Sequence, residues 1–229
     1  MNLIRLQKFL SQAGVCSRRQ AEVLIKQKQI KVNDQIAQLG DKVYPDRDKI
    51  EVKSKIVSFS PTKIYLLLNK PTGYVTTRSD RHAEKTIYDL LPKELKNQIW
   101  PVGWLYKNFS GLLILTNDGD LTQKLTHPSF EHEKEYLIRF RGLLNQEKIQ
   151  KLQKGVTLNG QPTLPFQVKL IKPDEVKIIL KEGQKRQIRE MLKVVGCQIT
   201  FLQRLRENKL KLSDLRVGQY KFITKNEIL

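Results

Sequence analysis

The spacing of hydrophobic residues changes once along the chain, and this change limits the possible folds more than any other feature. Before residue 53, hydrophobic residues recur at the intervals that mark one face of a helix, as in Leu6, Phe9, Leu10 and Ala13. After residue 64, short apolar runs of strand length predominate, such as Tyr65–Asn69. We therefore expect a small α-rich module followed by an α+β domain.

The N-terminal module is predicted to span residues 1–53. Gly14 ends its first helix, and Ser17 begins the second, because Ser17 and Gln20 have the spacing of a capping box. Strands are expected at Gln29–Val32 and Lys49–Val52. A unit of this length has a small core, so we expect it to be marginally stable in isolation.

Residues 54–63 are polar and contain Pro61, which predicts a linker. Residues 64–229 then alternate strand-like segments with shorter helical ones, a pattern that predicts a mixed, largely antiparallel sheet. The clearest predicted strands are Tyr65–Asn69, Gly111–Thr116, Tyr136–Phe140 and Val176–Leu180.

The charge balance is strongly basic, because 42 Lys and Arg residues against 23 Asp and Glu residues give a formal net charge of +19. Such an excess predicts a polyanionic partner, since each neutralised phosphate releases counterions and strengthens binding at low salt. A membrane surface could attract the same charge, but no apolar run approaches the ~20 residues of a spanning helix. We expect no membrane association, and a monomer when the protein is free.

The N-terminal residues lack the apolar segment and cleavage site of a secretory signal peptide. The two cysteines, Cys16 and Cys197, are too few for a disulfide framework and lack the spacing of metal ligands. Both are expected to be reduced packing residues. These features fit a reducing compartment, either the cytoplasm or the matrix or stroma of an organelle.

Basic residues on the expected helices avoid the apolar faces. In the segment 186–195, Ile188, Met191 and Leu192 share an apolar stripe, while Arg186 and Arg189 share a basic one. Ordinary solvated helices have such faces too, but two of them on a chain of this charge favour RNA contact. The residues predicted to contact RNA are Arg5, Lys8, Arg18, Arg19, Lys70, Trp104, Arg186, Arg204 and Arg206.

No arrangement typical of hydrolases or metalloenzymes is recognisable. His127 and His132 are separated by Pro128 and do not share a helix face as metal ligands would. Asp118 could pair with Asp120, but Asp118 occupies a turn position that favours an Asx side chain, so we expect a structural role. Without a glycine-rich phosphate loop as well, the sequence predicts neither a metal nor a cofactor.

Several short motifs carry a resemblance that covers essentially the whole chain. They are Arg5-Leu6-Gln7-Lys8-Phe9-Leu10, Ser17-Arg18-Arg19-Gln20, Leu68-Asn69-Lys70-Pro71, Pro101-Val102-Gly103, Leu115-Thr116-Asn117-Asp118-Gly119, Lys134-Glu135-Tyr136, Arg186-Gln187-Ile188-Arg189, and Leu212 to Leu215 with Gly218 and Tyr220. The first two resemble an S-four-type RNA-binding module. The others resemble ribosomal RNA pseudouridine synthases of the RsuA type.

This resemblance implies a reaction and the residues for it. In the family an aspartate of a Gly-Arg-Leu-Asp motif attacks the target uridine, whose base detaches, rotates and rejoins its sugar through carbon. The nucleotide is flipped out of its helix into the pocket. Tyr136 matches the tyrosine that stacks on the base, and Arg189 matches the arginine that holds the aspartate. The resemblance implies no cofactor, and ribosomal RNA or a ribosomal particle as the partner.

The chain departs from the family motif where the attacking group is expected. It reads Gly103-Trp104-Leu105-Tyr106, which puts Tyr106 at the nucleophile position. A phenol, whose ordinary pKa is about 10, is neutral at pH 7 and lacks the charge and geometry of a carboxylate.

Two neighbouring features change with it. Phe109 stands where the family has a small hydroxyl residue, and Arg189 loses its expected ion partner, so Arg189 should turn to solvent, a phosphate or another acceptor. In addition, the segment 206–210 replaces an Ile-Gly-Pro segment of the family, which predicts one altered pocket wall.

Three functional interpretations remain open. The first, which we favour, is a catalytically impaired family member that binds ribosomal RNA and acts in ribosome assembly or as a ribosome-bound factor. Its aromatic residues would stack on bases or, as we expect, fill the vacated pocket. The second is an active synthase with a displaced carboxylate, Asp80 or Asp118. The third is a module for acidic proteins, against which the S-four-type resemblance argues.

Overall fold

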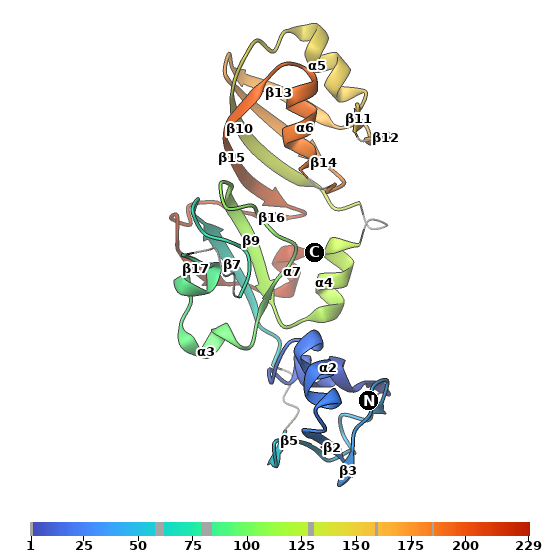
Figure 1. Cartoon of the computed structure of the whole chain (residues 1–229). Helices are drawn as coiled ribbons and strands as arrows, with labels where there is room; N and C mark the ends of the chain where they lie inside the picture. The colour runs from blue at the N-terminus through green and yellow to red at the C-terminus, as the bar shows by residue number, and fades with distance from the viewer. Residues whose placement is uncertain (1, 58–61, 79–83, 128–130, 159, 185) are drawn as a thin grey trace. The chain divides into compact units, whose positions relative to one another are not determined.

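The computed structural model describes residues 2–57, 62–78, 84–127, 131–158, 160–184 and 186–229. Its contacts divide the chain into two compact units. The first comprises Met1–Ile64, Leu91–Trp100 and Thr116–Gly119, and the second comprises Tyr65–Leu90, Pro101–Leu115 and Asp120–Leu229. Helices and strands occur in both, so the predicted α+β class is confirmed (Figure 1).

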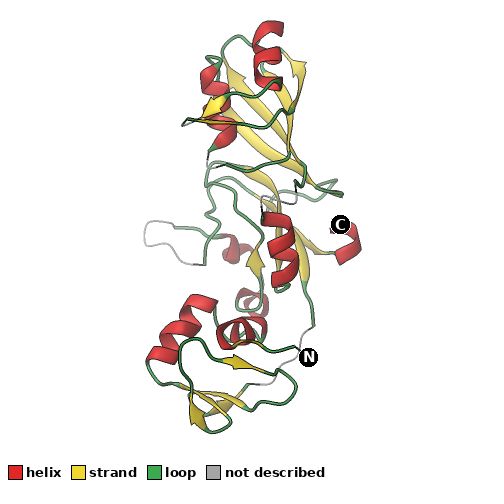
Figure 2. Cartoon of the chain, turned by 90° about the vertical axis from the view of Figure 1, so that its right-hand side faces the viewer, coloured by secondary structure: helices red, strands yellow, loops and turns green. Residues whose placement is uncertain are grey.

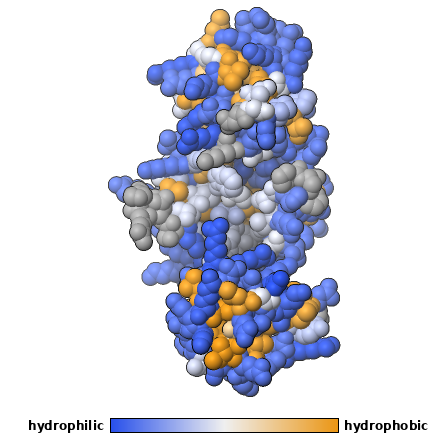
Figure 3. All heavy atoms as spheres, turned by 45° about the vertical axis from the view of Figure 1, so that its right-hand side comes forward, coloured by the Kyte–Doolittle hydropathy of each residue, from blue (hydrophilic) through white to orange (hydrophobic). Residues whose placement is uncertain are grey.

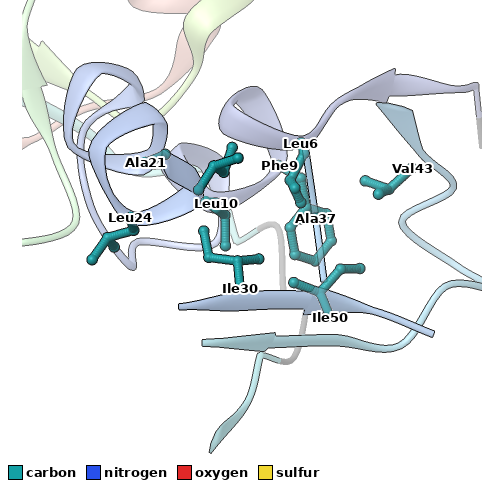
Figure 4. Close-up of a cluster of buried hydrophobic side chains, with 10 residues drawn as sticks. Leu6, Phe9, Leu10, Ala21, Leu24, Ile30, Ala37, Val43 and Ile50 are labelled. Carbon is teal, nitrogen blue, oxygen red and sulfur yellow. The ribbon is translucent and has the colours of Figure 1, made fainter. Parts of the chain in front are cut away.

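Two helices packed on a small sheet form the N-terminal module, as the hydrophobic spacing predicts. The helices are α1 (Leu6–Gln12) and α2 (Arg18–Lys26), and the sheet has the order β3 (Gln35–Ile36), β2 (Ile30–Val32), β5 (Ile50–Val52), β6 (Lys55–Ile56), with a separate pair β1 (Ile4–Arg5) and β4 (Lys42–Val43). In Figure 4, Phe9 and Leu10 of α1 lie over Ile30 and Ile50 of the sheet, and these buried side chains form the module's core.

The start of α2 confirms half of the predicted capping box. The Ser17 hydroxyl accepts a hydrogen bond from the Gln20 backbone N–H at 3.2 Å, which satisfies one of the free donors of the first turn. The sequence predicts that the module ends at residue 53, but contacts of the same kind continue beyond it. Strand β6 pairs with β5, and Val57 packs against the core, so the module extends into the segment predicted as a linker.

The second unit is built on a nine-stranded sheet, with the order β13-β14-β10-β15-β9-β7-β17 and with β16 and β8 paired to β15 and β9. The strands are β7 (Tyr65–Lys70), β8 (Trp100–Pro101), β9 (Ser110–Thr116), β10 (Lys134–Arg141), β13 (Gln167–Lys172), β14 (Glu175–Leu180), β15 (Gln198–Glu207), β16 (Leu210–Lys211) and β17 (Tyr220–Phe222). Strand β10 pairs antiparallel with β14 and β15, whereas β9 pairs in parallel with β15. All four strands predicted from the sequence are present.

Four helices of this unit pack on the sheet: α4 (Gly119–Thr126), α5 (Gln146–Gln153), α6 (Gln187–Val194) and α7 (Lys225–Ile228). The unit also has a 3-10 turn at Ile87–Leu90 and a small hairpin of β11 (Thr157–Leu158) and β12 (Gln161–Pro162), whereas α3 (Lys93–Lys96) belongs to the first unit. Helix α6 packs against β15 and α5 against β13 (Figures 1 and 2). Gly196, at φ +75°, follows the last turn of α6, as the sequence predicts.

Hydrophilic residues predominate on the face in Figure 3, interrupted by a hydrophobic area on the N-terminal module. None of the helices in the described part of the chain has the length and apolar character needed to cross a bilayer.

Candidate functional site

The second unit contains a cavity of about 610 Å³. Its walls come from the loop 103–109, from strands β10 and β15, and from the start of α6. The three residues that the family resemblance placed in a catalytic site, Tyr106, Tyr136 and Arg189, all line it. The fold therefore brings together segments that are far apart in the sequence.

A β-bulge decides which side chains of β15 reach this cavity. Tyr136 on β10 lies opposite Arg204, but its neighbour Glu135 lies opposite Arg206, so one extra residue is inserted in β15. Beyond the bulge, Glu207 lies opposite Lys134. Because alternate residues of β10 share a face, two facing pairs line the cavity: Tyr136 with Arg204, and Lys134 with Glu207.

Arg204 and Glu207 form an ion pair in the wall of the cavity. Their relative exposures are 3% and 1%, and Nη1 of Arg204 lies 3.3 Å from Oε2 of Glu207. Nε of Arg204 donates to the Leu112 carbonyl at 2.7 Å. The backbones approach closely here, since a Cβ on Gly111 would lie 2.3 Å from the Arg204 carbonyl oxygen, and Gly111 has φ +105°. This packing fixes the guanidinium against the sheet.

Burial changes the pKa of Tyr136 and of Lys134, the two residues of β10 that line the cavity. It raises the pKa of the Tyr136 phenol, although the neighbouring Arg204 guanidinium acts in the opposite direction. Burial lowers the pKa of Lys134, partly offset by attraction to the Glu207 carboxylate. The cavity therefore concentrates four polar groups at a partly desolvated wall.

Lys70 and Thr76 hold the loop that carries Tyr106. The Lys70 ammonium donates to the carbonyl oxygens of Phe109, Pro71 and Tyr106 at 2.8, 3.0 and 3.1 Å. The Thr76 hydroxyl donates to the Leu105 carbonyl at 2.7 Å. Lys70 is fully buried, which lowers its pKa to about 8. The structure gives no support to the prediction that Lys70 contacts RNA, because its ammonium is buried and donates to three carbonyl oxygens of the protein.

Tyr106, Phe109 and Arg189 make aromatic contacts where the family resemblance implies an ion pair between an aspartate and an arginine. The rings of Tyr106 and Phe109 meet edge to face, with centroids 5.6 Å apart. The Arg189 guanidinium carbon lies 5.6 Å from the Phe109 ring centroid, a cation–π contact. Among the described residues, no carboxylate lies within ion-pair distance of Arg189. Arg189 is exposed, so it is open to solvent, one of the outcomes expected from the sequence, and it also contacts the ring of Phe109.

The cavity remains open beside these rings. Phe109 is buried, but Trp104 is 59% exposed at its edge. Of the three aromatic side chains expected to fill the vacated pocket, Phe109 is buried against Tyr106, whereas Trp104 leaves the cavity open at its edge.

The other predicted RNA-contacting residues fall into two groups. Arg5, Arg18, Arg19 and Arg186 are exposed and Lys8 is half-buried, which leaves the prediction open for them. Arg206 is turned away from the cavity by the bulge, and it hydrogen-bonds to Glu135 at 3.1 Å and to Glu133 at 3.0 Å. Its charge is neutralised there, so the structure gives no support to an RNA contact by Arg206.

Asp118 and Asp80 are the carboxylates that the sequence offers as alternative nucleophiles. Asp118 belongs to the first unit, where it pairs with Lys63 at 3.6 Å, and Asp80 lies outside the described residues. The sequence-based prediction missed Glu207, which lines the cavity from the segment expected to alter a pocket wall. Lys134 was missed as well. Within the described residues, no cluster of three or more His, Cys, Asp or Glu side chains is placed to hold a metal ion.

Comparisons with known proteins agree with this architecture. A family model described as RNA pseudouridylate synthase matches residues 64–193, and one described as the S4 domain matches residues 4–46. Ribosomal large subunit pseudouridine synthase B of Bacillus subtilis is 36% identical over 232 residues, which cover 98% of this chain and 93% of that protein. The dual-specificity RNA pseudouridine synthase RluF of Escherichia coli is 33% identical, covering 99% of this chain and 77% of that protein. The crystal structure of a pseudouridylate synthase superposes with a TM-score of 0.72 at 27% identity, covering 98% of each chain.

Proposed function

Because this chain belongs to the RNA pseudouridylate synthase family, we propose that it binds ribosomal RNA without isomerising uridine through position 106. It acts in ribosome assembly or as a factor that stays bound to the ribosome. The name of the Bacillus subtilis relative assigns that protein to the large ribosomal subunit, which makes large-subunit RNA the first substrate to test.

The observation that carries this proposal is the aromatic cluster at the nucleophile position. A phenol stands at residue 106, and the ring of Phe109 lies between it and the guanidinium of Arg189 in a chain of close contacts. The family reaction needs an anionic oxygen as attacking group, held by that arginine. Here neither the anion nor its ion pair is present among the described residues.

RNA binding is supported by charge and exposure. The net charge is +19, and exposed arginines occur both in the N-terminal module and at the start of α6. Phosphate contacts of this kind release counterions, so the affinity for RNA falls steeply as salt is raised.

One observation favours a second candidate function, that of an active synthase with a displaced carboxylate. Glu207 lines the same cavity as Tyr136 and is a carboxylate. Against it, Glu207 pairs with Arg204 and not with Arg189. We therefore rank this function second.

The test is to incubate purified protein with unmodified transcripts of large-subunit ribosomal RNA, and to measure binding and chemically mapped pseudouridine in the same samples. The expected result is salt-sensitive binding with no new pseudouridine, while the Bacillus subtilis relative serves as the positive control. A pseudouridine formed by wild type and lost in Glu207→Gln would establish the second candidate. Salt-independent binding would contradict both.

A matched variant sharpens this test. Tyr106→Asp alone is expected to form no pseudouridine, because Trp104 and Phe109 remain and the Arg189 guanidinium that should hold the new carboxylate still lies against the Phe109 ring. Activity restored by this single change would show that the rest of the pocket is intact.

A further inference from the structure

A second groove, which we call the outer groove, lies on the face of the sheet opposite to the cavity. It has a volume of about 580 Å³ and shares no lining residue with the cavity. Glu135 on β10, Lys177 on β14 and Arg206 on β15 line it, together with β16 and the segment 212–217. Helices α5 and α6 lie on the cavity side of these strands (Figure 2), so the outer groove is formed by the sheet and this segment.

Two pairs of like charges face each other across neighbouring strands on this side of the sheet. Lys169 on β13 lies directly opposite Lys177 on β14, and Arg206 on β15 lies directly opposite Lys211 on β16. Like charges in directly opposed positions destabilise a sheet. The sheet therefore keeps an arrangement of charges that its own stability does not favour.

The carboxylate between these pairs neutralises only one member of each. Glu135 lies 3.4 Å from the Lys177 ammonium and 3.1 Å from Nε of Arg206. The other two members, Lys169 and Lys211, are exposed, and among the described residues neither has a carboxylate within ion-pair distance. Both charges are therefore available to an anion from solution.

The segment 212–217 adds a further cation from a wall that is already fixed. Nδ2 of Asn69 donates to the Leu215 carbonyl at 2.7 Å, which ties the segment to β7. Arg216 is exposed and lines the outer groove, as does the acidic Asp214. Four basic and two acidic side chains line the groove in all, so it is positively charged. A wall that is fixed before binding loses little conformational freedom when a ligand arrives.

The extent of this basic surface favours an extended anion. Strands β13, β14, β10, β15 and β16 follow one another across the sheet, so Lys169 and Lys211 are separated by four strand spacings of about 4.8 Å, roughly 19 Å in all. A single phosphate cannot contact both ends of such a row. A nucleic-acid strand can, because it carries one negative charge per nucleotide.

The lining of the outer groove favours RNA over an acidic protein. Gln203 and Ser213 line it beside the cations, and phosphate oxygens accept hydrogen bonds from such side chains. Protein interfaces are enriched in aromatic side chains, whereas the described residues that line this groove include none. The groove thus has the groups that bind a nucleic-acid backbone and lacks rings on which bases could stack.

We propose that the outer groove binds the phosphate backbone of a second RNA segment. Lys169, Lys211 and Arg216 contact the phosphates, while Arg206 remains in its own ion pairs beneath them. This inference rests on the proposed function and extends it, because the first RNA segment is the one held by the exposed arginines of the N-terminal module and of α6. A chain with two such surfaces joins two RNA segments.

The experiment measures whether protein that is already bound to one RNA captures another. A biotinylated fragment of large-subunit ribosomal RNA is fixed on beads and saturated with the full-length protein, and a fluorescent single-stranded polyadenosine RNA is then added. Wild type is expected to capture the second RNA with an affinity that falls as salt is raised, since phosphate contacts are independent of sequence. Capture no greater than on beads without protein would overturn the proposal.

Two double variants with the same change of charge locate the contact. Lys169→Gln with Lys211→Gln is expected to weaken capture of the second RNA about tenfold and to lower the slope of log affinity against log salt by about 1.4, or about 0.7 per lost contact. Lys151→Gln with Lys154→Gln removes two exposed lysines in and just after α5, on the cavity side, and is expected to change neither value. Equal losses in the two double variants would mean that only net charge matters, and would refute a contact in the outer groove.

Two further measurements address a structural role and an acidic partner. Each substitution in the groove removes one member of a like-charge pair, so the urea midpoint is expected to rise, whereas a lower midpoint would indicate that these lysines stabilise the sheet and would count against the proposal. Polyglutamate that binds wild type but not the groove variant, without any capture of RNA, would assign the groove to an acidic protein instead.

The outcomes also distinguish this inference from the proposed function. Salt-sensitive binding of the ribosomal RNA fragment without capture of a second RNA would sink the inference alone. New pseudouridine in the transcript assay would sink the proposed function and leave the second RNA contact standing.

Discussion

The two faces of the paired strands β10 and β15 both carry arginine and glutamate, but they differ in burial and in how fully these side chains are hydrogen-bonded. On the cavity face, Arg204 and Glu207 are almost completely buried and keep polar atoms without partners. On the other face, Arg206 hydrogen-bonds to Glu133, to Glu135 and to the Asn208 carbonyl, with its side chain partly open to solvent. Arg206 therefore belongs to a charge network whose hydrogen bonds are complete, whereas the neighbouring pair Arg204 and Glu207 keeps polar atoms without hydrogen bonds.

This difference shows how charged side chains that only stabilise the fold can be distinguished from those available to bind a ligand. A partly exposed network that satisfies its own groups stabilises the fold modestly and needs no ligand. A buried ion pair whose polar atoms lack hydrogen bonds makes the ligand-free protein less stable than a state in which those hydrogen bonds are formed. The incomplete hydrogen bonds are on the cavity face.

The largest expected contrast is in stability. Glu207→Leu leaves Arg204 buried without its counter-ion and should lower the free energy of unfolding by about 3–5 kcal/mol. Glu135→Leu on the other face should cost about 1 kcal/mol or less, because Arg206 keeps Glu133 and contact with solvent. Urea unfolding of the two variants measures both values. Equal losses in the free energy of unfolding would show that the two faces of the sheet do not differ in this way.

A smaller contrast lies in salt dependence. A double-mutant cycle on Glu135 and Arg206 should give a coupling energy of at most about 1 kcal/mol that shrinks as salt is added. The same cycle on Arg204 and Glu207 should give a larger value that salt barely changes, since both side chains are almost completely buried. A salt-sensitive coupling in the cavity would show that the pair is solvated.

The smallest expected effect is a pH dependence of stability that arises from Glu135, on the face of the sheet that carries Arg206. Burial raises the pKa of Glu135, but hydrogen bonds from Arg206 and Lys177 outweigh burial and lower it overall. A carboxyl with a lowered folded-state pKa adds stability above its unfolded pKa of about 4.3, and that stability is lost as the pH falls.

The stability difference between wild type and Glu135→Gln should accordingly be greatest near neutral pH and vanish in acid. Unfolding midpoints of both proteins across this range provide the measurement. A difference that grows as the pH falls would mean that the carboxylate is not stabilised on this face.

Much of the fold could be predicted from the sequence because periodicity reports burial directly. The helices of the N-terminal module and the strand around Tyr136 follow from residue spacing alone. Strand alternation fails at the bulge, however. Both Arg204 and Arg206 are predicted from the sequence to contact RNA, and a regular strand would place them on one face. The inserted residue instead turns Arg206 away and brings Glu207 in.

The site could be predicted only for residues that the family resemblance identifies, and not for residues whose type serves several purposes. Tyr106, Tyr136 and Arg189 could be brought together through a family resemblance, and they do share a cavity. Lys70 could not be interpreted in this way, because a lysine that binds phosphate and one that holds backbone carbonyls look alike in sequence. Only the fold shows that its ammonium has three internal acceptors.

We propose that this protein binds ribosomal RNA but no longer rearranges uridine. The most direct measurement crosslinks the protein to RNA in cells and maps pseudouridine in the crosslinked RNA, with and without the protein. The account predicts crosslinks to ribosomal RNA at positions whose pseudouridine content is the same in both samples. A pseudouridine at the crosslinked position that disappears with the protein would contradict it.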